Sequence, residues 1–140
     1  MIIGSGVDIV EVERIKRVVE RWGDRFLRKV FTDREIEFAN KRKCVFQHLA
    51  ARFAAKEAVI KAFANGVHIG VSWKDIEVTN DKGGKPSITL YGLYHRFMWE
   101  WNIGEVIVSM SHTKDYALST VLLVGNARSD FGPSGGNSST

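Results

Sequence analysis

The chain has 140 residues and a mass of 15.7 kDa, with 44% hydrophobic and 26% charged residues, which is typical of one globular domain. Its single cysteine, Cys44, rules out an intramolecular disulfide and favours a reducing, cytoplasmic environment. No apolar run approaches the roughly 20 residues of a membrane-spanning helix, and the N-terminus does not resemble a signal peptide, so we expect no membrane partner.

The formal net charge of +4 comes from one short segment. Between Glu13 and Lys29 there are seven basic and three acidic residues. The net charge of this segment is therefore +4, equal to that of the entire chain. If this segment is one continuous helix, five arginines lie within about 80° of one another on its surface: Arg14, Arg17, Arg21, Arg25 and Arg28. Such a stripe predicts an acidic partner, either a nucleic acid or an acidic protein helix.

The first predicted elements are a strand and a helix. Residues 1–10 are rich in Ile, Val and Gly, which predicts a buried strand. From Glu11 to about Val30 the apolar residues recur at three- and four-residue spacings, which predicts a helix that Gly23 can kink or split.

Two further helices follow in the first half. Thr32 with Glu35 forms the pattern of a capping box, which predicts the start of a helix over Asp33–Asn40. An alanine-rich segment then predicts a longer helix from about Val45 to Ala64, ended by Asn65-Gly66.

The second half changes to the period of strands. A turn over residues 80–85 separates two short strands and predicts a hairpin, and two more strands flank residues 111–115. In chain order the predicted elements are a strand over Trp73–Thr79, a strand over Pro86–Tyr91, a helix over Gly92–Trp101, and strands over Glu105–Met110 and Tyr116–Val124. We therefore expect an α+β fold in which a mostly antiparallel sheet packs against a long helix. Residues 1–125 would form one domain, and residues 126–140 a disordered tail rich in Gly and Ser.

Two carboxylates stand out as candidates for chemistry. Asp8 lies inside an apolar strand, where an ionised carboxylate is costly unless it is paired or bound to a metal. Glu57 and Lys61 lie four residues apart on the long helix, at the edge of its apolar stripe and beside alanines. Taken singly, each observation is also explained by an ordinary structural ion pair. Together, Asp8 and Glu57 suit Mg²⁺, which prefers one or two carboxylates with waters and phosphate oxygens.

Other kinds of site find less support. There is no Cys/His cluster with zinc spacing, and Gly4-Ser5-Gly6 lacks the Gly-Lys-Ser/Thr of a phosphate-binding loop. His112 with its neighbouring serines does not form a convincing catalytic triad. His112 can be read as a phosphate or hydroxyl contact or as a structural histidine, and Lys85 as an anion contact or a solvated hairpin lysine.

At this point the residues resemble a known family. Gly6-Val7-Asp8 followed by Phe53-Ala54-Ala55-Lys56-Glu57-Ala58-Val59-Ile60-Lys61 is similar to the two-part signature of the 4′-phosphopantetheinyl transferases. More narrowly, the chain resembles the short holo-[acyl-carrier-protein] synthases, and the resemblance extends over roughly residues 2–124. Further matching stretches are Phe31-Thr32-Asp33-Arg34-Glu35, Gly84-Lys85-Pro86 and Val108-Ser109-Met110-Ser111-His112-Thr113.

The resemblance implies an activity and a set of site residues. Members of the family transfer the phosphopantetheine arm of coenzyme A to a serine of apo acyl carrier protein and release adenosine 3′,5′-bisphosphate, in support of fatty acid biosynthesis. By position, Asp8 and Glu57 match the magnesium ligands, and Lys61 matches the lysine near the diphosphate. Arg52, Lys85 and His112 align with positions that line the coenzyme A site.

The resemblance also implies partners and an assembly. Arg14 and Arg21 lie on the helix that docks the acidic carrier protein, in agreement with the charge distribution. Short members of the family form trimers with active sites between subunits. Mechanistically, we expect Glu57 to accept the proton of the attacking serine, directly or through a metal-bound water, and Lys61 to stabilise the leaving side.

Two other functions remain as alternatives. A non-catalytic module could bind nucleic acid through the arginines, although its strands carry no recognisable stacking motif. A magnesium-dependent phosphohydrolase could use the same two carboxylates with water as the nucleophile. We rank both below the transferase and expect no nucleic acid partner.

Overall fold

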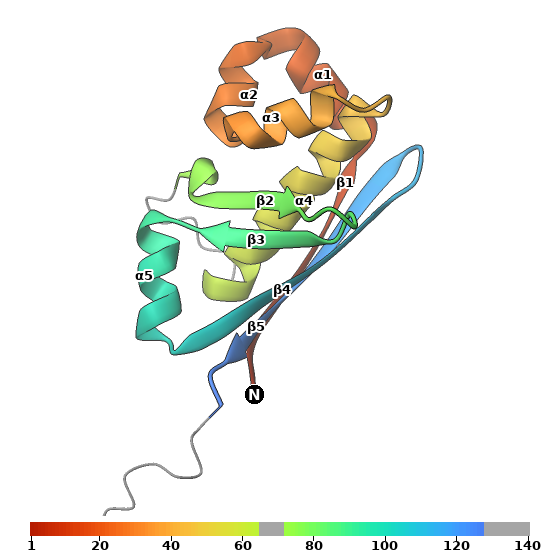
Figure 1. The fold of residues 1–140 in the computed structure, drawn as a ribbon. Coiled ribbons are helices and arrows are strands. Elements are labelled where there is room, and N and C mark those ends of the chain that lie inside the picture. The colour runs from red at the N-terminus through yellow and green to blue at the C-terminus, as the bar shows by residue number, and fades with distance from the viewer. Residues whose placement is uncertain (65–71, 128–140) are drawn as a thin grey trace, which may run out of the picture.

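The computed structural model describes residues 1–64 and 72–127, and these form two antiparallel sheets around one long helix (Figure 1). In chain order the elements are β1 (Ile2–Glu11), α1 (Val12–Trp22), α2 (Asp24–Val30), α3 (Asp33–Asn40), α4 (Val45–Ala64), the 3₁₀ helix η1 (Trp73–Asp75), β2 (Ile76–Asn80), β3 (Pro86–Leu90), α5 (Gly92–Glu100), β4 (Ile103–His112) and β5 (Tyr116–Gly125). The α+β class with antiparallel sheets is confirmed. Within the described part of the chain, no helix has both the length and the apolar character required to cross a membrane.

The larger sheet has the strand order β1-β5-β4, so the last strand of the chain lies in the middle. Both pairings are antiparallel, and Ser119 in β5 lies between Asp8 in β1 and Met110 in β4. The second sheet is the hairpin β2–β3, which pairs from Ile76↔Leu90 to Asn80↔Pro86. In Figure 1 this hairpin lies across α4.

Helix α4 lies at the centre of the fold because small residues let the neighbouring backbone approach it. Ala50, Ala54 and Ala58 are completely buried. Strand β1 passes so close to α4 that a Cβ atom added at Gly6 would collide with the carbonyl group of Ala58. Glycine is therefore needed in β1 where the strand passes the helix.

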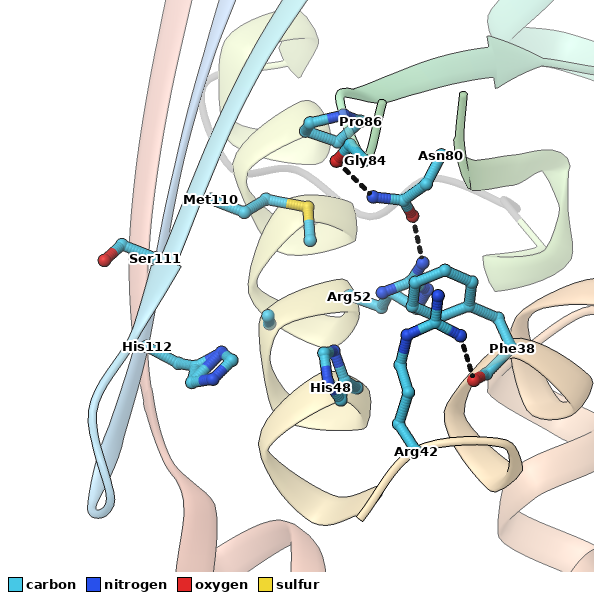
Figure 2. Close-up of a pocket in the computed structure, with 11 residues that line it drawn as sticks. Phe38, Arg42, His48, Arg52, Asn80, Gly84, Pro86, Met110, Ser111 and His112 are labelled. Atoms are coloured by element: carbon cyan, nitrogen blue, oxygen red, sulfur yellow. Dashed lines mark hydrogen bonds between the residues drawn. The ribbon is translucent and has the colours of Figure 1, made fainter. Parts of the chain in front are cut away.

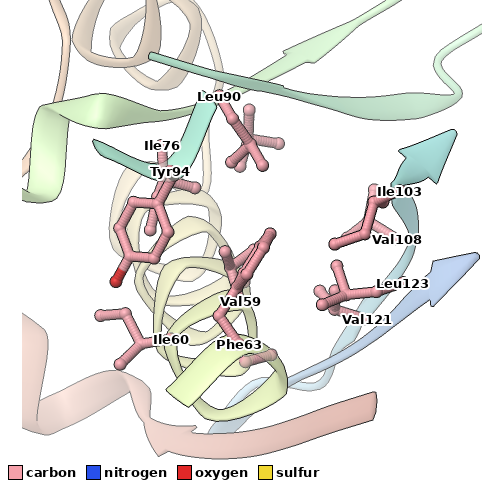
Figure 3. Packing of buried hydrophobic residues seen from close by; sticks show 13 residues of the cluster. Val59, Ile60, Phe63, Ile76, Leu90, Tyr94, Ile103, Val108, Val121 and Leu123 are labelled. Carbon is pink, nitrogen blue, oxygen red and sulfur yellow. The ribbon is translucent and has the colours of Figure 1, made fainter. Parts of the chain in front are cut away.

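Two clusters of buried side chains share α4. One joins the second half of α4 to the hairpin, to α5 and to the inner faces of β4 and β5, with Val59, Phe63 and Tyr94 among its members (Figure 3). The other joins the first half of α4 to α1, α2 and α3 and includes Ile15 and Phe31. Figure 1 shows these three short helices gathered at one end of α4.

The helix predictions are confirmed in their positions. Thr32 and Glu35 form the predicted capping box at the start of α3. As expected from Gly23, the segment after β1 is split, since Gly23 has a φ of 55° and separates α1 from α2. The condition for a single arc of five arginines is therefore not met, and Arg25 and Arg28 lie on α2. The predicted stop at Asn65-Gly66 lies outside the described residues.

Three differences between the observed and predicted strands bear on the site. Residues 73–75 form a 3₁₀ helix rather than the start of a strand. Strand β4 continues to His112, so two residues expected in the turn belong to the strand. In β1, Val7 and Ile9 are 53% and 62% exposed, so only one face of this strand packs on α4 and the prediction of a fully buried strand is wrong. The predicted tail over 126–140 is described only for Asn126 and Ala127.

A buried ion pair links three elements around α4. Lys56 Nζ lies 2.8 Å from Glu35 Oε1, and both side chains are completely buried. Lys56 also donates to the carbonyl oxygens of Trp73 and Ile76, while Glu35 Oε2 accepts from the backbone N–H of Val78 at 2.9 Å. Burial lowers the pKa of Lys56, and the charge of Glu35 opposes this shift. The pair therefore fixes α3, α4 and the start of the hairpin to one another.

We predict that Lys56→Met destabilises the protein by about 3–5 kcal/mol, because it leaves the carboxylate of Glu35 buried without a counter-charge. Chemical denaturation followed by circular dichroism measures this change. The matched control is Lys41→Met, since Lys41 pairs with Glu37 on the surface and its loss should leave the unfolding midpoint nearly unchanged. Equal midpoints for Lys56→Met and wild type would contradict the role of the buried pair.

Candidate active site

A cavity of about 290 Å³ opens between the first half of α4 and the turn of the hairpin (Figure 2). Its walls also include residues of α3, the segment after it and the end of β4. Four of its side chains are basic or titratable, and none of its lining residues is a carboxylate. The four are Arg42, His48, Arg52 and His112. We call this the basic pocket, and its charge suits an anionic ligand.

Arg52 forms the floor of the basic pocket. Only 1% of it is exposed, and its guanidinium group lies 4.0 Å from the ring centroid of Phe38. It donates a hydrogen bond to Asn80 Oδ1, and Asn80 Nδ2 in turn donates to the carbonyl oxygen of Gly84 at 2.9 Å (Figure 2). Burial lowers the pKa of Arg52 to about 10, so the group still carries its positive charge at neutral pH. Its Nε atom is buried and has no hydrogen-bond partner among the residues that the structure describes.

Two lining residues of the basic pocket were missed from the sequence. Arg42 follows α3 and donates to the carbonyl oxygen of Phe38 at 2.9 Å. Its guanidinium group lies 3.3 Å from the centroid of the Phe38 ring. His48 lies in the first turn of α4 and points toward His112 (Figure 2). The only sequence signal for Arg42 was its place in the basic run Lys41-Arg42-Lys43, which also describes an ordinary solvated turn.

The predicted nucleotide contacts Arg52 and His112 are brought together in this pocket, although they are 60 positions apart in the sequence numbering. Lys85 differs from them. Its neighbours Gly84 and Pro86 line the pocket, whereas Lys85 itself is exposed and its backbone N–H donates to Asp81 Oδ1 at 2.9 Å. The structure therefore places Lys85 at the rim.

The predicted metal ligands lie elsewhere, where β1 passes α4. Lys61 Nζ lies 2.8 Å from Asp8 Oδ1 and donates to the carbonyl oxygen of Val7 at 3.1 Å. Glu57 lies half-buried one helical turn before Lys61 and directly before Ala58, the residue against which Gly6 packs. The ion pair with Lys61 thus accounts in part for a carboxylate in this apolar strand. We call Asp8, Glu57 and Lys61 the carboxylate group of the site.

The carboxylate group can supply only some of the ligands that a metal ion requires. Among the described residues, no cluster of three or more His, Cys, Asp or Glu side chains could enclose an ion. Two carboxylates that leave several coordination positions for water and phosphate fit Mg²⁺ rather than zinc. The donor atoms of Asp8 and Glu57 therefore suit the predicted metal.

The two halves of the predicted site are separate on one chain. Arg52 and Lys61 are nine residues apart on α4, which corresponds to about 14 Å along the helix axis. A second cavity contains Lys61 and residues 5–7 and 120–122, and it shares no lining residue with the basic pocket. The structure thus brings together Arg52 with His112, and Asp8 with Lys61, but not these two pairs with each other.

The predicted docking residues lie on an exposed surface. Arg14 and Arg21 of α1 are both exposed. Beside them, Trp22 is 49% exposed, and the guanidinium groups of Arg21 and Arg25 lie 5.2 and 5.8 Å from its ring centroid. A shallow hollow lined by Trp22, Arg25 and other residues of α1 and α2 adjoins them. This surface combines positive charge with an apolar, aromatic centre.

Comparisons with known proteins identify the family of the chain. A family model described as the 4′-phosphopantetheinyl transferase superfamily matches residues 4–121. Curated relatives named holo-[acyl-carrier-protein] synthase include that of Caldanaerobacter subterraneus, 43% identical over 129 residues, which covers 92% of this chain and 100% of the relative. The relative from Solibacter usitatus is 41% identical over 123 residues, covering 88% of this chain and 98% of the relative.

Solved structures show the same fold. The holo-[acyl-carrier-protein] synthase of Neisseria meningitidis superimposes with a TM-score of 0.80 at 34% identity, covering 88% of this chain and 98% of that one. The Helicobacter pylori synthase, solved in complex with coenzyme A, gives a TM-score of 0.74 at 32% identity, with 85% and 98% covered. The chain therefore belongs to the 4′-phosphopantetheinyl transferase superfamily, and the prediction made from its two-part signature is confirmed.

Proposed function

We propose that this protein is a holo-[acyl-carrier-protein] synthase that transfers the phosphopantetheine arm of coenzyme A to a serine of apo acyl carrier protein. The observation that carries the proposal is a basic pocket without carboxylates at the first half of α4, together with the carboxylate group of Asp8 on β1 and Glu57 and Lys61 on α4. The first suits the phosphates of a nucleotide, and the second suits the reacting diphosphate. Relatives whose titles name bound coenzyme A support this choice of substrate.

The basic pocket would hold the nucleotide part of coenzyme A. Arg52 is fixed by Asn80 and by the ring of Phe38, so little side-chain freedom remains to be lost on binding. His112 faces it from the end of β4, and Lys85 at the rim would reach a phosphate from the hairpin. These three residues are the contacts that we assign to the nucleotide.

The carboxylate group would carry the chemistry. Asp8 and Glu57 would hold Mg²⁺, which, when bound, neutralises charge on the diphosphate. Glu57 would accept the proton of the carrier serine as its oxygen attacks the β-phosphorus of coenzyme A. The bond from that phosphorus to the leaving nucleotide oxygen breaks, and adenosine 3′,5′-bisphosphate is released. Lys61 would stabilise the negative charge that develops on this leaving side.

The exposed arginines of α1 would dock the carrier protein. Arg14 and Arg21 are two of the seven basic residues in the segment that accounts for the net charge of the chain. Trp22 beside them offers an apolar centre, which the middle of a protein interface usually has. An acidic carrier helix matches both features. Phosphopantetheinylation of such a carrier in the cytoplasm would serve fatty acid biosynthesis.

A complete site would need a second copy of the chain. The basic pocket and the carboxylate group are separate within one chain, so a neighbouring subunit would have to bring the two together. The outer face of the larger sheet provides a surface for this contact, because Val7, Ile9, Ile107 and Leu118 are each at least 40% exposed. A homotrimer with three sites between adjacent subunits accounts for both observations.

The reaction itself can be tested by mass spectrometry of apo carrier protein after incubation with coenzyme A, Mg²⁺ and this protein. We predict a mass gain equal to one phosphopantetheine arm. Glu57→Gln should slow this gain at least about 100-fold, because a carboxylate that binds the metal and accepts the proton is lost. The matched control is Glu100→Gln, since Glu100 is an exposed residue of α5 that pairs with Arg96.

Three outcomes would contradict these assignments. A carrier whose mass stays unchanged with the wild-type protein would rule out the transfer. Hydrolysis of coenzyme A in the absence of any carrier would instead indicate a phosphohydrolase. Near-normal turnover by Glu57→Gln at saturating Mg²⁺ would remove both roles given to Glu57.

The docking surface gives a separate prediction. Arg14→Glu should raise the KM for the carrier about tenfold, because it places a negative charge against an acidic partner. Its affinity for coenzyme A should stay unchanged, as measured by isothermal titration calorimetry. Lys74→Glu makes the same charge change at an exposed position of η1 and should leave both values unaltered. Loss of coenzyme A binding in Arg14→Glu would move Arg14 into the nucleotide site.

A further inference from the structure

His48 has no role in the function proposed above, yet it lies among the cationic groups of the basic pocket. It belongs to the first turn of α4, one turn before Arg52, and it is half-buried. Its ring meets the ring of Phe38 edge-on at a centroid distance of 5.7 Å and the ring of His112 edge-on at 5.3 Å. It thus connects the wall formed by α3 to the wall formed by β4.

The charges that face His48 come from each element around it. Arg52 lies on its own helix, Arg42 on the segment after α3, and His112 at the end of β4. From the hairpin the lining residues are Asn80, Gly84 and Pro86, which carry no charge. All charged or titratable groups that line the pocket are therefore of one sign, and an extra proton on His48 adds to their repulsion.

Without an anion nearby, this environment favours the neutral imidazole. The pKa of His48 is lowered first by burial and then by the positive charges of Arg52, His112 and Arg42. A phosphate monoester carries a charge of about −2 at neutral pH. Its arrival offsets the positive charges of Arg42 and Arg52 and so favours the protonated imidazole.

We propose that His48 is a further substrate-binding residue, which takes up a proton from solvent when a phosphate group of the nucleotide enters the basic pocket. A neutral imidazole donates a hydrogen bond from only one of its ring nitrogens, whereas the protonated ring of His48 donates from both and so has a donor for the phosphate. The inference rests on the proposed function, since it names a residue of the same nucleotide site. The affinity of this chain for its substrate then depends on pH, because binding is coupled to the uptake of a proton.

The direction of the pH dependence follows from linkage. Binding that takes up a proton weakens as pH rises between the pKa of His48 in the free protein and its higher pKa in the complex. The affinity for coenzyme A should therefore fall by up to about tenfold per pH unit across this interval. A proton lost from the phosphate of the ligand would have the opposite sign, so the two sources can be separated.

The experiment is isothermal titration calorimetry of coenzyme A at constant Mg²⁺, in buffers with different ionisation enthalpies, between pH 6 and pH 8. We expect the wild-type protein to take up at least about 0.3 proton per coenzyme A at pH 7. His48→Phe keeps an aromatic ring against Phe38 but cannot bind a proton, so its uptake and its pH dependence should disappear. His95→Gln, at an exposed position of α5, is the matched control and should behave as wild type.

The outcomes separate this inference from the proposed function. If coenzyme A does not bind the wild-type protein, the proposed function fails. If coenzyme A binds and the carrier is modified, but wild type and His48→Phe take up equal numbers of protons, only the role of His48 is overturned. A histidine resonance that titrates with the same pKa in free and coenzyme A-bound protein, and is lost in His48→Phe, would overturn it independently by NMR.

Discussion

The close passage of β1 over α4 is the contact on which the rest of the structure depends. Gly6 allows it, because any side chain there would collide with the backbone of Ala58. The contact sets Asp8 within 2.8 Å of Lys61 and leaves Glu57 on the adjoining turn of the helix. Residues separated by 53 positions thereby become neighbours on rigid elements rather than on loops.

The same helix also separates the two kinds of chemistry. Its first half contributes His48 and Arg52 to a basic pocket without carboxylates, and its second half contributes Glu57 and Lys61 beside Asp8. The buried pair of Lys56 and Glu35 lies between them and holds the hairpin and α3 against the helix. The carboxylates of Asp8 and Glu57 are thus kept away from the basic pocket within one chain, which keeps the pocket available for an anion. Joining the two halves into one site then falls, in our proposal, to a neighbouring subunit.

The sequence predicted best what depends on neighbouring residues. The capping box of Thr32 and Glu35, the long alanine-rich helix and the hairpin turn follow from local spacing, and the structure confirms them. The partner of Asp8 and the pairing of His48 with His112 depend on contacts across the fold, which periodicity does not encode. The exposed face of β1 was missed for a related reason, since a run of apolar residues does not show whether both faces of a strand are buried in the core of its own chain. The residues themselves singled out Asp8, Glu57 and Lys61, and the family resemblance added Arg52, but neither showed which of these side chains lie together on one chain.

Complementation between subunits tests the central claim, that one site is built from two chains. Glu57→Gln inactivates the carboxylate group and His112→Ala the basic pocket, so each protein alone should be inactive. Co-expressed in equal amounts, the two variants should restore about a quarter of the wild-type sites, because an interface that receives both intact halves is then active. Transfer of phosphopantetheine to the carrier measures the recovery. Mixed oligomers as inactive as either variant alone would show that each chain holds its own complete site.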